Sequence, residues 1–575
     1  MSMFKKIVVC LAAIMLIGMV LPVLGSETPI VSVAFMWGGQ QNNLNGPFQE
    51  WLAENHGFKL KIIPIEGDSQ QQYALWASAH QLPDIFNFYS DAAYHIANGQ
   101  KGMAIPLNKY FNDVKNYPNI AGVPMMVRSR YMDGKGTFWS VPGGNTYNPE
   151  TPPLQAVKDS FGRWCWYPKY LIDGYRSYAR KSADWFPTYT EEWIKYTEWA
   201  CKQKTPDGKP VYAGIPLEGH DGIGMAQLMQ SFSMPAGAWD LPICFDTKGQ
   251  PTPAVITKQV YNAYRQGARW YRKKITDPEM WSITRDGFEA KMFAGQYASM
   301  DGCDLSRYNG VANEKMVTPE IGPCPVPRIA PENQMLVGWR SAMGWNGMQI
   351  SGDCKTPDLA AKALDWLTSP EGGIAIKMGI PDVDWKWTKP PVHGGDVIVT
   401  VLEHGKQFVQ GFGTSSDECE KNAWAYGINA RPFSAFTFNG NSADISNMPK
   451  SGQAAIQEAA YEKYKDTPLK YTCGQECPTW QNVSVADPKY NDYANELKDK
   501  FYQMLGFKLY NTKNDIEFDK VYKQMLKQFL PQLKKTIQMK KVDYDKMIAL
   551  KMGFEKYTKG MGSYETVIPW DPFGK

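Results

Sequence analysis

Apolar and polar positions follow two different periods through the first hundred residues after an apolar amino-terminal run. A continuous apolar segment at 30–37 and a period-two segment at 58–62 predict strands, and 82–88 predicts a third. Segments 47–54 and 68–80 place their large apolar side chains on one face of a helix. The order strand, helix, strand, helix, strand predicts a parallel sheet with right-handed crossovers.

Turn and cap signals divide the rest of the chain. Residues 131–149 are rich in Gly and Pro, which suits a hinge where backbone torsions change. Thr188 and Glu191 have the spacing of a capping box, and Thr356 before Pro357 has the pattern of a helix start. The other expected elements are strands at 164–167 and 296–300 and helices at 260–273, 356–367, 370 onward and 491–529.

The amino terminus has the pattern of an export leader. Lys5 and Lys6 precede an apolar run at 7–24, and Gly25 follows at a position that a signal peptidase reads. We therefore expect a signal peptide at 1–25, cleaved near Gly25, and a mature protein in the periplasm or at the cell surface. Cys10 lies too early in the leader to carry a lipid, so we expect no lipid anchor. No later apolar run reaches the ~18 residues that a membrane span needs.

Length, charge and cysteine content narrow the class further. A chain of 575 residues is too long for one core, so two or more lobes are expected. The formal charge of 62 − 58 = +4 argues against nucleic-acid binding, which needs a broad basic face. Removing Cys10 with the leader leaves nine cysteines, so at least one thiol stays unpaired, while Cys473 and Cys477 form a plausible short-range disulfide.

Signals for catalysis or metal binding are weak. The six His residues are scattered without zinc-ligand spacing, and neither a Gly-x-Ser-x-Gly elbow nor a phosphate loop occurs. The turn at 205–210 lacks the alternating acids of a calcium loop. We therefore expect no catalytic residue, no metal and no cofactor. Paired carboxylates keep an exported hydrolase or lyase open as an alternative, because 58 acids allow many spatial pairs.

Several blocks, in their order and spacing, carry a family resemblance. They are Gly67–Tyr73 with Leu82–Phe86, Asp133–Pro142, Phe186–Trp193, Phe293–Met300 and Thr356–Ile376. On these blocks the chain resembles bacterial extracellular solute-binding proteins of family 1, in particular the long members that bind aldouronate or alginate oligosaccharides for ABC importers.

The resemblance implies an α/β fold of the type II periplasmic-binding-protein kind. Two lobes would be joined by a multi-stranded hinge, with the ligand in a cleft between them. The amino-terminal lobe would comprise 27–155 plus 300–345, and the other lobe 156–299 plus 346–575 with extra carboxy-terminal helices. The implied partners are an oligosaccharide, possibly containing uronate, and the transmembrane permease subunits; we expect a monomer. A peptide-binding importer component is a further alternative.

Ligand contacts are expected where strands of each lobe end toward the other lobe. The candidates are aromatic rings, which stack on sugar faces, and polar groups, which bind hydroxyls. They are Trp37, Gln40, Asn42, Tyr89, Asp91, Asn145, Tyr147, Glu218, His220, Trp239, Asp301, Trp345, Trp385 and Trp387.

Structural roles stand beside these assignments. Asp91 has the alternative of capping the next helix, His220 of a hydrogen bond within its loop, and the Trp385-Lys-Trp387 pair of packing a lobe edge. An acidic sugar would also need cationic side chains, for which the candidates are Arg128, Arg163, Arg340 and Arg431.

Overall fold

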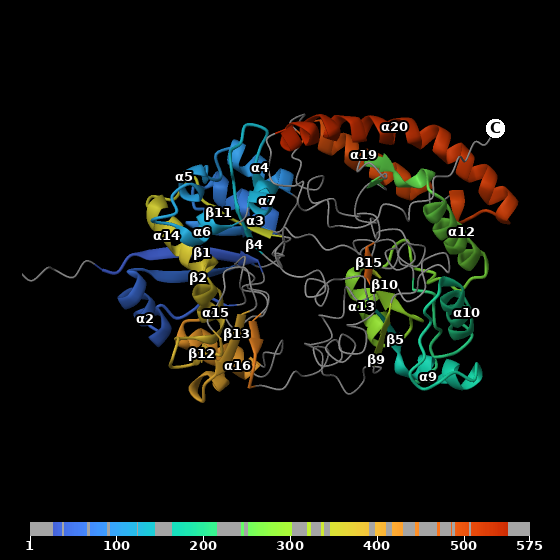
Figure 1. Cartoon of the computed structure of the whole chain (residues 1–575), viewed down its shortest axis with the longest axis horizontal. Helices are drawn as coiled ribbons and strands as arrows, with labels where there is room; N and C mark the ends of the chain where they lie inside the picture. Colours follow the sequence, from blue (N-terminus) through green and yellow to red (C-terminus); the bar gives the residue numbers. More distant parts are fainter. Residues whose placement is uncertain are drawn as a thin grey trace, which may run out of the picture.

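The computed structural model describes most of the chain between residues 27 and 549. The described ranges are 27–36, 40–65, 69–88, 92–123, 125–143, 164–214, 243–245, 251–301, 319–323, 335–337, 346–389, 397–409, 417–428, 443–447, 469–471, 485, 489–504 and 508–549. Their helices and strands form two groups, one on each side of the view in Figure 1. Within these ranges no helix is long and apolar enough to cross a membrane.

A five-stranded sheet forms the centre of the first lobe, in the order β2-β1-β3-β11-β4. Its strands are β1 (Ile30–Met36), β2 (Lys59–Ile65), β3 (Ile85–Phe88), β4 (Val141–Gly143) and β11 (Asn346–Ile350). β2 and β3 pair with β1 in parallel, whereas β11 lies antiparallel between β3 and β4. The parallel arrangement predicted for the first three strands is confirmed.

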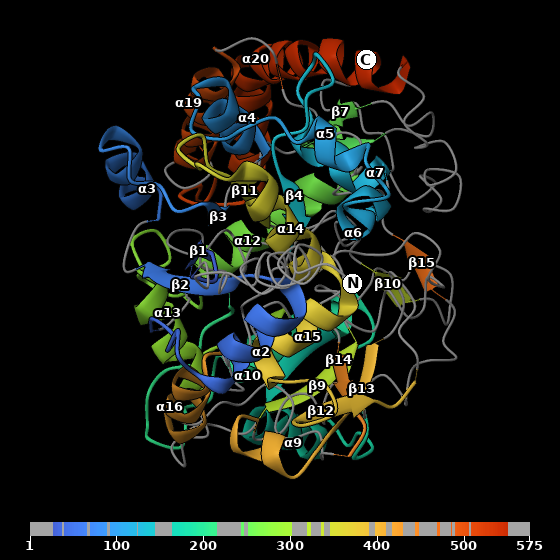
Figure 2. The same ribbon diagram turned by 90° about the vertical axis from the view of Figure 1, so that its left-hand side faces the viewer.

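Helices cover this sheet and close its core. α2 (Pro47–His56), α14 (Pro357–Thr368) and α15 (Pro370–Met378) lie on the side that faces the viewer in Figure 2. The Trp366 ring of α14 packs against the rings of Phe48, Trp51 and Phe58 at centroid distances of 6.2–6.4 Å. This cluster fastens a late segment of the chain to its beginning. The other helices of this lobe are α3 (Ser69–Ser78), α4 (Ala92–Gln100), α5 (Asn108–Phe111), α6 (Pro118–Gly122) and α7 (Met125–Arg128), followed by the 3-10 turn η1 (Ser129–Tyr131).

A small sheet and one helix extend the first lobe. The sheet contains β12 (Trp385–Trp387), β13 (Val397–Val401) and β14 (Ala443–Ile445). Between β13 and β14 the chain forms η5 (His404–Gln407) and α16 (Asp417–Tyr426). The end of α16 contacts the loop after β1, where Asn43 N–H donates to the Trp424 carbonyl at 3.0 Å. Gly46 lies so close to the Tyr426 carbonyl that an added Cβ would stand 2.5 Å from its oxygen, so no larger residue fits there.

The second lobe has a three-stranded antiparallel sheet in the order β8-β5-β9. Its strands are β5 (Trp164–Pro168), β8 (Met300–Asp301) and β9 (Pro319–Pro323). Trp166 and Trp193 are fully buried in this lobe. The remaining elements are α9 (Lys169–Tyr178), α10 (Thr190–Ala200), β6 (Ile243–Phe245), β7 (Pro251–Pro253), η3 (Ala254–Ile256), α12 (Lys258–Arg272), α13 (Arg285–Phe293), β10 (Met335–Val337), β15 (Leu469–Tyr471), α19 (Tyr490–Met504) and α20 (Asp515–Ala549).

The strand pairings correct the expected division between lobes. Residues 300–345 were expected in the first lobe, but β8 and β9 both pair with β5 of the second. Residues 346–575 were expected in the second lobe, but β11 joins the first sheet, and α14 packs there through Trp366. Short strands carry too little pattern to show which sheet they join, so the crossover positions taken from the resemblance were wrong for β8, β9 and β11.

Local predictions also need adjustment. Only Met300–Asp301 forms β8, because Tyr297 makes an isolated bridge with Tyr212 instead of extending the strand. The capping box of α10 is formed by Tyr189 and Glu192, one residue later than predicted, and Glu192 Oε2 accepts from Thr188 N–H at 3.1 Å.

Candidate functional site

Four strand ends meet at one edge of the first sheet. β1 ends at Met36, and the parallel strand β3 ends at Phe88. Because β11 is antiparallel to β3 and β4, its first residue, Asn346, pairs with the last residue of β4, Gly143. Carboxyl ends of parallel strands are where open α/β sheets bind ligands. This edge is therefore the first half of the candidate site.

Five predicted contact residues adjoin this edge in the chain. Trp37, Tyr89, Asn145, Tyr147 and Trp345 lie outside the described residues. Their described neighbours are the four strand ends that meet at the edge. The topology thus brings together segments that the sequence separates by more than three hundred positions.

The second half of the site is one edge of the second sheet. Trp164 at the start of β5 pairs with Pro323 at the end of β9, and Cys165 pairs with Asp301 at the end of β8. The chain passes from Gly143 to Trp164, and from Pro323 towards Asn346. Both passages connect the two edges just defined. Asp301 ends β8 and so lies at this edge of the second sheet, whereas 300–345 was expected in the first lobe; its side chain lies outside the described atoms.

A buried glutamine holds the first edge in place. The Gln349 side chain of β11 donates to the carbonyls of His95 and Trp139, both at 3.0 Å, and accepts from Asn98 at 3.2 Å. His95 Nδ1 lies 2.8 Å from Ser140 Oγ. Helix α4, strand β11 and the segment before β4 are thereby joined by hydrogen bonds around one fully buried side chain. Sequence reasoning missed Gln349; the available signal was a polar residue inside an otherwise apolar strand.

Strand β3 is fixed from the other side. The Tyr73 hydroxyl donates to the Asn87 carbonyl at 2.6 Å, and the Asn87 amide lies 3.4 Å from Met348 Sδ. Burial raises the pKa of the Tyr73 hydroxyl well above its usual value. The hydroxyl therefore stays a neutral donor and keeps the end of β3 in register.

The described part of the expected hinge is a closed turn. Asp133 Oδ1 accepts from the N–H groups of Lys135 and Thr137 at 2.9 and 3.0 Å, and Oδ2 accepts from Trp139 Nε1 at 3.1 Å. Val141 then enters the first sheet, fully buried. Residues 131–143 are thus a fixed part of the first lobe, so a hinge in the predicted stretch has to lie after Gly143.

Asn42 has a structural role, which corrects its assignment as a ligand contact. It is 4% exposed. Its amide nitrogen donates to the carbonyls of Leu60 and Gly427 at 2.9 and 3.2 Å, and its oxygen accepts from Ile62 N–H at 2.8 Å. Both amide N–H groups and one acceptor position of the oxygen are thus used within the fold. Gln40, two residues earlier, is exposed and remains a candidate.

The Trp385-Lys-Trp387 pair also serves packing. The two rings lie on one side of β12, with centroids 4.8 Å apart. Trp385 is fully buried, and its indole N–H donates to the Gly379 carbonyl at 2.9 Å. Trp385 therefore offers no face to a ligand, and Trp387 is half-buried against it.

The remaining candidates divide into one structural residue and several outside the described ranges. Arg128 donates to the Phe111 carbonyl at 3.2 Å and lies over the rings of Phe111 and Phe138, and burial lowers its pKa. It therefore packs within the first lobe. The candidates outside the described residues are Asp91, Arg163, Glu218, His220, Trp239, Arg340 and Arg431.

The described residues bear on metal binding and on the cysteines. Among the described residues no group of three or more His, Cys, Asp or Glu side chains could hold a metal ion. In the turn at 205–209, Lys209 Nζ lies 3.0 Å from the Asp207 carboxylate. Cys201 and Cys354 are free cysteines among the described residues, while Cys473 and Cys477 lie outside them.

Sequence comparisons give no match, whereas structural comparisons do. No family model and no curated protein matches the chain. An extracellular solute-binding protein from Bifidobacterium longum subsp. infantis has a similar structure, with a TM-score of 0.60, 14% identity, and 90% of this chain and 98% of that chain covered.

Two further structures agree. The S. pneumoniae ABC-transporter substrate-binding protein FusA, in complex with kestose, gives a TM-score of 0.58 at 15% identity over 91% of this chain and 100% of that chain. The alginate-binding protein AlgQ2, without calcium ion, gives 0.54 at 15% identity over 90% and 98%. The chain therefore has the two-lobe α/β fold of these solute-binding proteins.

Proposed function

We propose that this protein is the substrate-binding component of an ABC importer and that it captures an oligosaccharide between its lobes. The observation that carries the proposal is the meeting of four strand ends at one sheet edge, joined by two chain passages to a set of strand ends in the second lobe. Trp37, Tyr89 and Trp345 adjoin the first edge and would supply stacking faces, and Asn145, Asp301 and Gln40 would bind hydroxyls.

The mechanism follows from two lobes that share one ligand. A sugar held by the first lobe gains contacts with the second only when the lobes close, so its affinity is higher for the closed form. That difference shifts the equilibrium toward closure. Transmembrane permease subunits would then accept the closed form. The expected location outside the cytoplasm belongs to the same proposal.

Intrinsic tryptophan fluorescence provides the test. Titration with neutral fructo-oligosaccharides and with uronate-containing fragments of alginate, pectin and xylan should give saturable binding for one class. Trp37→Ala and Trp345→Ala should each weaken that binding at least about fivefold, because stacking of a ring on an aromatic side chain contributes on the order of 1–3 kcal/mol. Trp185→Phe, a change at a ring stacked on Tyr175 at 5.3 Å in the second lobe, is the matched control and should leave affinity unchanged.

Two results would reject the proposal. The absence of a fluorescence change with every sugar class would reject an oligosaccharide as the ligand. Recovery of shortened or unsaturated sugars after incubation would instead favour an exported hydrolase or lyase, since a transport component returns its ligand chemically unchanged.

A further inference from the structure

Helix α20 has one face buried against the second lobe and another that is strongly basic. The buried residues follow a helical period and are Phe518, Tyr522, Met525, Leu526, Phe529, Leu533 and Ile537. On the opposite face, Lys520, Lys523, Lys527 and Lys534 are exposed. Their spacing of 3, 4 and 7 residues places them on a single stripe, which we call the lysine stripe. It extends about 21 Å along the helix at 1.5 Å per residue.

The charge of this face is not balanced locally. Between Lys520 and Val542 the sequence has seven Lys and no Asp or Glu. Lys541 pairs with Asp545 at 2.6 Å, and Lys535 lies over the Tyr493 ring. The four lysines of the stripe make no ion pair with any other residue in the described ranges. The stripe therefore presents uncompensated positive charge, although the chain as a whole carries only +4.

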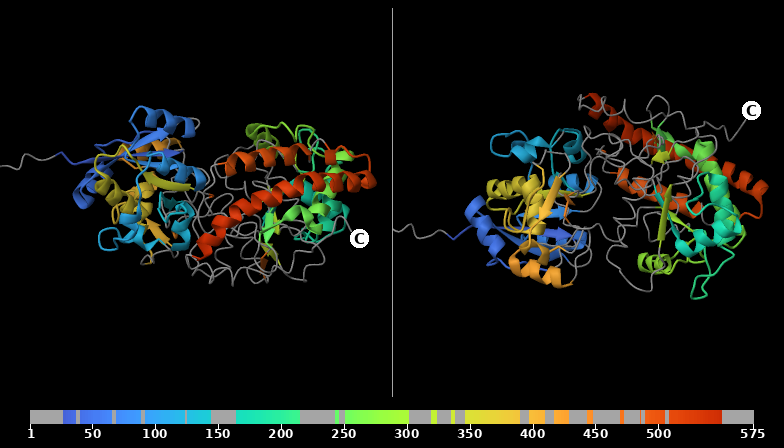
Figure 3. Two further views of the ribbon diagram at one scale, coloured as in Figure 1. Left: turned by 90° about the horizontal axis from the view of Figure 1, so that it is seen from above. Right: turned by 60° about the horizontal axis from the view of Figure 1, so that its bottom comes forward.

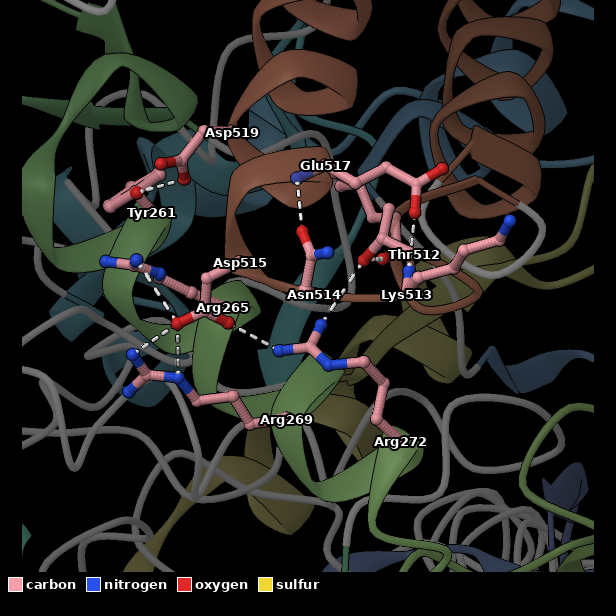
Figure 4. Close-up of polar contacts among 11 residues, drawn as sticks. Tyr261, Arg265, Arg269, Arg272, Thr512, Lys513, Asn514, Asp515, Glu517 and Asp519 are labelled. Carbon is pink, nitrogen blue, oxygen red and sulfur yellow. Dashed lines mark hydrogen bonds and ion pairs between the residues drawn. The ribbon is translucent and has the colours of Figure 1, made fainter.

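The start of α20 is anchored, so the stripe has a fixed direction. Asp515 accepts hydrogen bonds from Arg269 and Arg272 of α12 and lies 3.2 Å from Arg265, as Figure 4 shows. The Asp519 carboxylate of α20 also accepts a hydrogen bond from the Tyr261 hydroxyl of α12. Seen from above in Figure 3, α20 runs along the outside of the molecule. The contacts with α12 hold the apolar face inward and leave the lysines in solvent.

We propose that the lysine stripe docks the protein on an anionic membrane surface. A basic face on an amphipathic helix is typical of contact with such a surface. Ile516, one turn before Lys520 on the same face, is 82% exposed, which gives the stripe an apolar residue at its end that can enter the headgroup region. The occupant is a bilayer rich in acidic lipid, and the contact places the carrier next to any membrane-bound permease.

The shape and chemistry of the stripe favour a lipid surface over an acidic sugar. The surface of a single helix is convex. The lysines of the stripe follow one another from turn to turn, without aromatic rings between them on which a sugar could stack. Compact ammonium groups on flexible stems suit a diffuse layer of headgroups, whereas bidentate recognition of one carboxylate uses Arg. The arginines of this region are already engaged with Asp515.

Vesicle co-sedimentation tests the proposal with two variants of equal charge. One variant carries Lys520→Gln, Lys523→Gln, Lys527→Gln and Lys534→Gln. The control carries Lys195→Gln, Lys202→Gln, Lys204→Gln and Lys258→Gln, four exposed lysines elsewhere on the same lobe. The lipids are phosphatidylcholine with phosphatidylglycerol, and phosphatidylcholine alone. All three proteins keep the same amino-terminal segment, so neutral vesicles measure its contribution.

We expect the parent and control proteins to bind anionic vesicles at low ionic strength and to leave them in high salt. Each lysine removed from the stripe should weaken partitioning about fivefold. Circular dichroism melting verifies that both variants fold. Equal binding by both variants, or equal losses, would overturn the proposal, as would a parent protein that ignores anionic vesicles. Stripe-dependent binding to polyglutamate without vesicle binding would instead assign the face to an acidic protein.

Discussion

The two lobes each bury an aspartate, but they stabilise its charge differently. In the first lobe, Asp365 of α14 accepts from the backbone N–H groups of Asn119 and Ile120 at 2.9 and 2.8 Å and from the Asn119 amide at 2.8 Å. In the second, Asp277 lies 2.9 Å from Lys291 Nζ and accepts from the Tyr297 hydroxyl at 2.7 Å. Asp365 is 7% exposed and Asp277 is fully buried.

This difference shows what each carboxylate does. Asp365 satisfies N–H groups at the start of α6 that have no partner within the helix, so it joins two distant segments of one lobe. Asp277 neutralises a lysine that burial would otherwise penalise. Burial lowers the pKa of Lys291, but its hydrogen bonds to Glu279 and Asp277 outweigh this, and the net shift is upward. Removing Asp365 thus leaves backbone N–H groups without their acceptor, whereas removing Asp277 leaves the Lys291 charge with less compensation.

The largest effect is expected for Asp277→Ala. It leaves Lys291 with only Glu279 and removes the acceptor of Tyr297, so the free energy of unfolding should fall by about 3–5 kcal/mol. Urea unfolding measures the loss, and hydrogen exchange in 285–301 locates it in the second lobe. Adding Lys291→Met should recover part of the stability. A loss below about 1 kcal/mol for Asp277→Ala alone would show that the Asp277–Lys291 ion pair contributes little to the stability of this lobe.

Asp365→Ala should cost less, about 2–3 kcal/mol, because neutral donors rather than a cation lose their acceptor. Asp365→Asn keeps one acceptor oxygen for the two backbone N–H groups and should lose only about 1 kcal/mol. Asp277→Asn, by contrast, should remain nearly as damaging as Asp277→Ala. Urea unfolding of the four variants decides the point, and equal losses for both Asn variants would remove the proposed distinction between the lobes.

The sequence predicted the first lobe better than the second for a physical reason. In the first lobe, strands and helices alternate with clear periods, and the first three strands of the chain pair in parallel in the order β2-β1-β3. In the second, β8 and β9 are short, antiparallel and paired with a strand more than 130 positions earlier. Such pairing depends on long-range packing that no local pattern records, which is why β11 was assigned to the wrong lobe.

Site prediction had the same limit. Strand-end logic selected Trp37, Tyr89 and Trp345, whose neighbouring strands do meet at one edge. It could not separate Asn42 from Gln40, because both are amides in one loop. Only the third dimension shows that Leu60, Ile62 and Gly427 surround the first of them.

That distinction gives a prediction within the first lobe. Asn42→Ala should lower the free energy of unfolding by about 2 kcal/mol, because the Leu60 carbonyl and the Ile62 N–H lose their side-chain partner, while the Gly427 carbonyl keeps the Gln49 amide. Gln40→Ala should leave stability unchanged and weaken ligand binding if Gln40 contacts the sugar. Urea unfolding and fluorescence titration of both variants give opposite patterns. Unchanged stability in Asn42→Ala would return that residue to the list of ligand contacts.

The smallest expected effect concerns the second lobe at acid pH. A hydrogen bond from Arg269, with the charges of Arg265 and Arg272, lowers the pKa of Asp515. A group whose pKa is lower in the folded state stabilises the fold above its unfolded value of about 3.9 and loses that contribution as pH falls through the folded value. Solvent partly screens this half-buried cluster, so the change is a fraction of that expected for Asp277.

Asp515→Asn should therefore have a lower free energy of unfolding than the parent protein at neutral pH. The difference should shrink as the pH falls from about 5 to about 3. Urea unfolding across this range measures the difference. Asp545→Asn, which breaks the exposed Lys541 pair on the same helix, is the control and should differ little at any pH. If the difference in unfolding free energy between Asp515→Asn and the parent stays constant with pH, packing rather than charge holds α12 against α20. In that case the second lobe would rely on packing where the first relies on hydrogen bonds to its backbone.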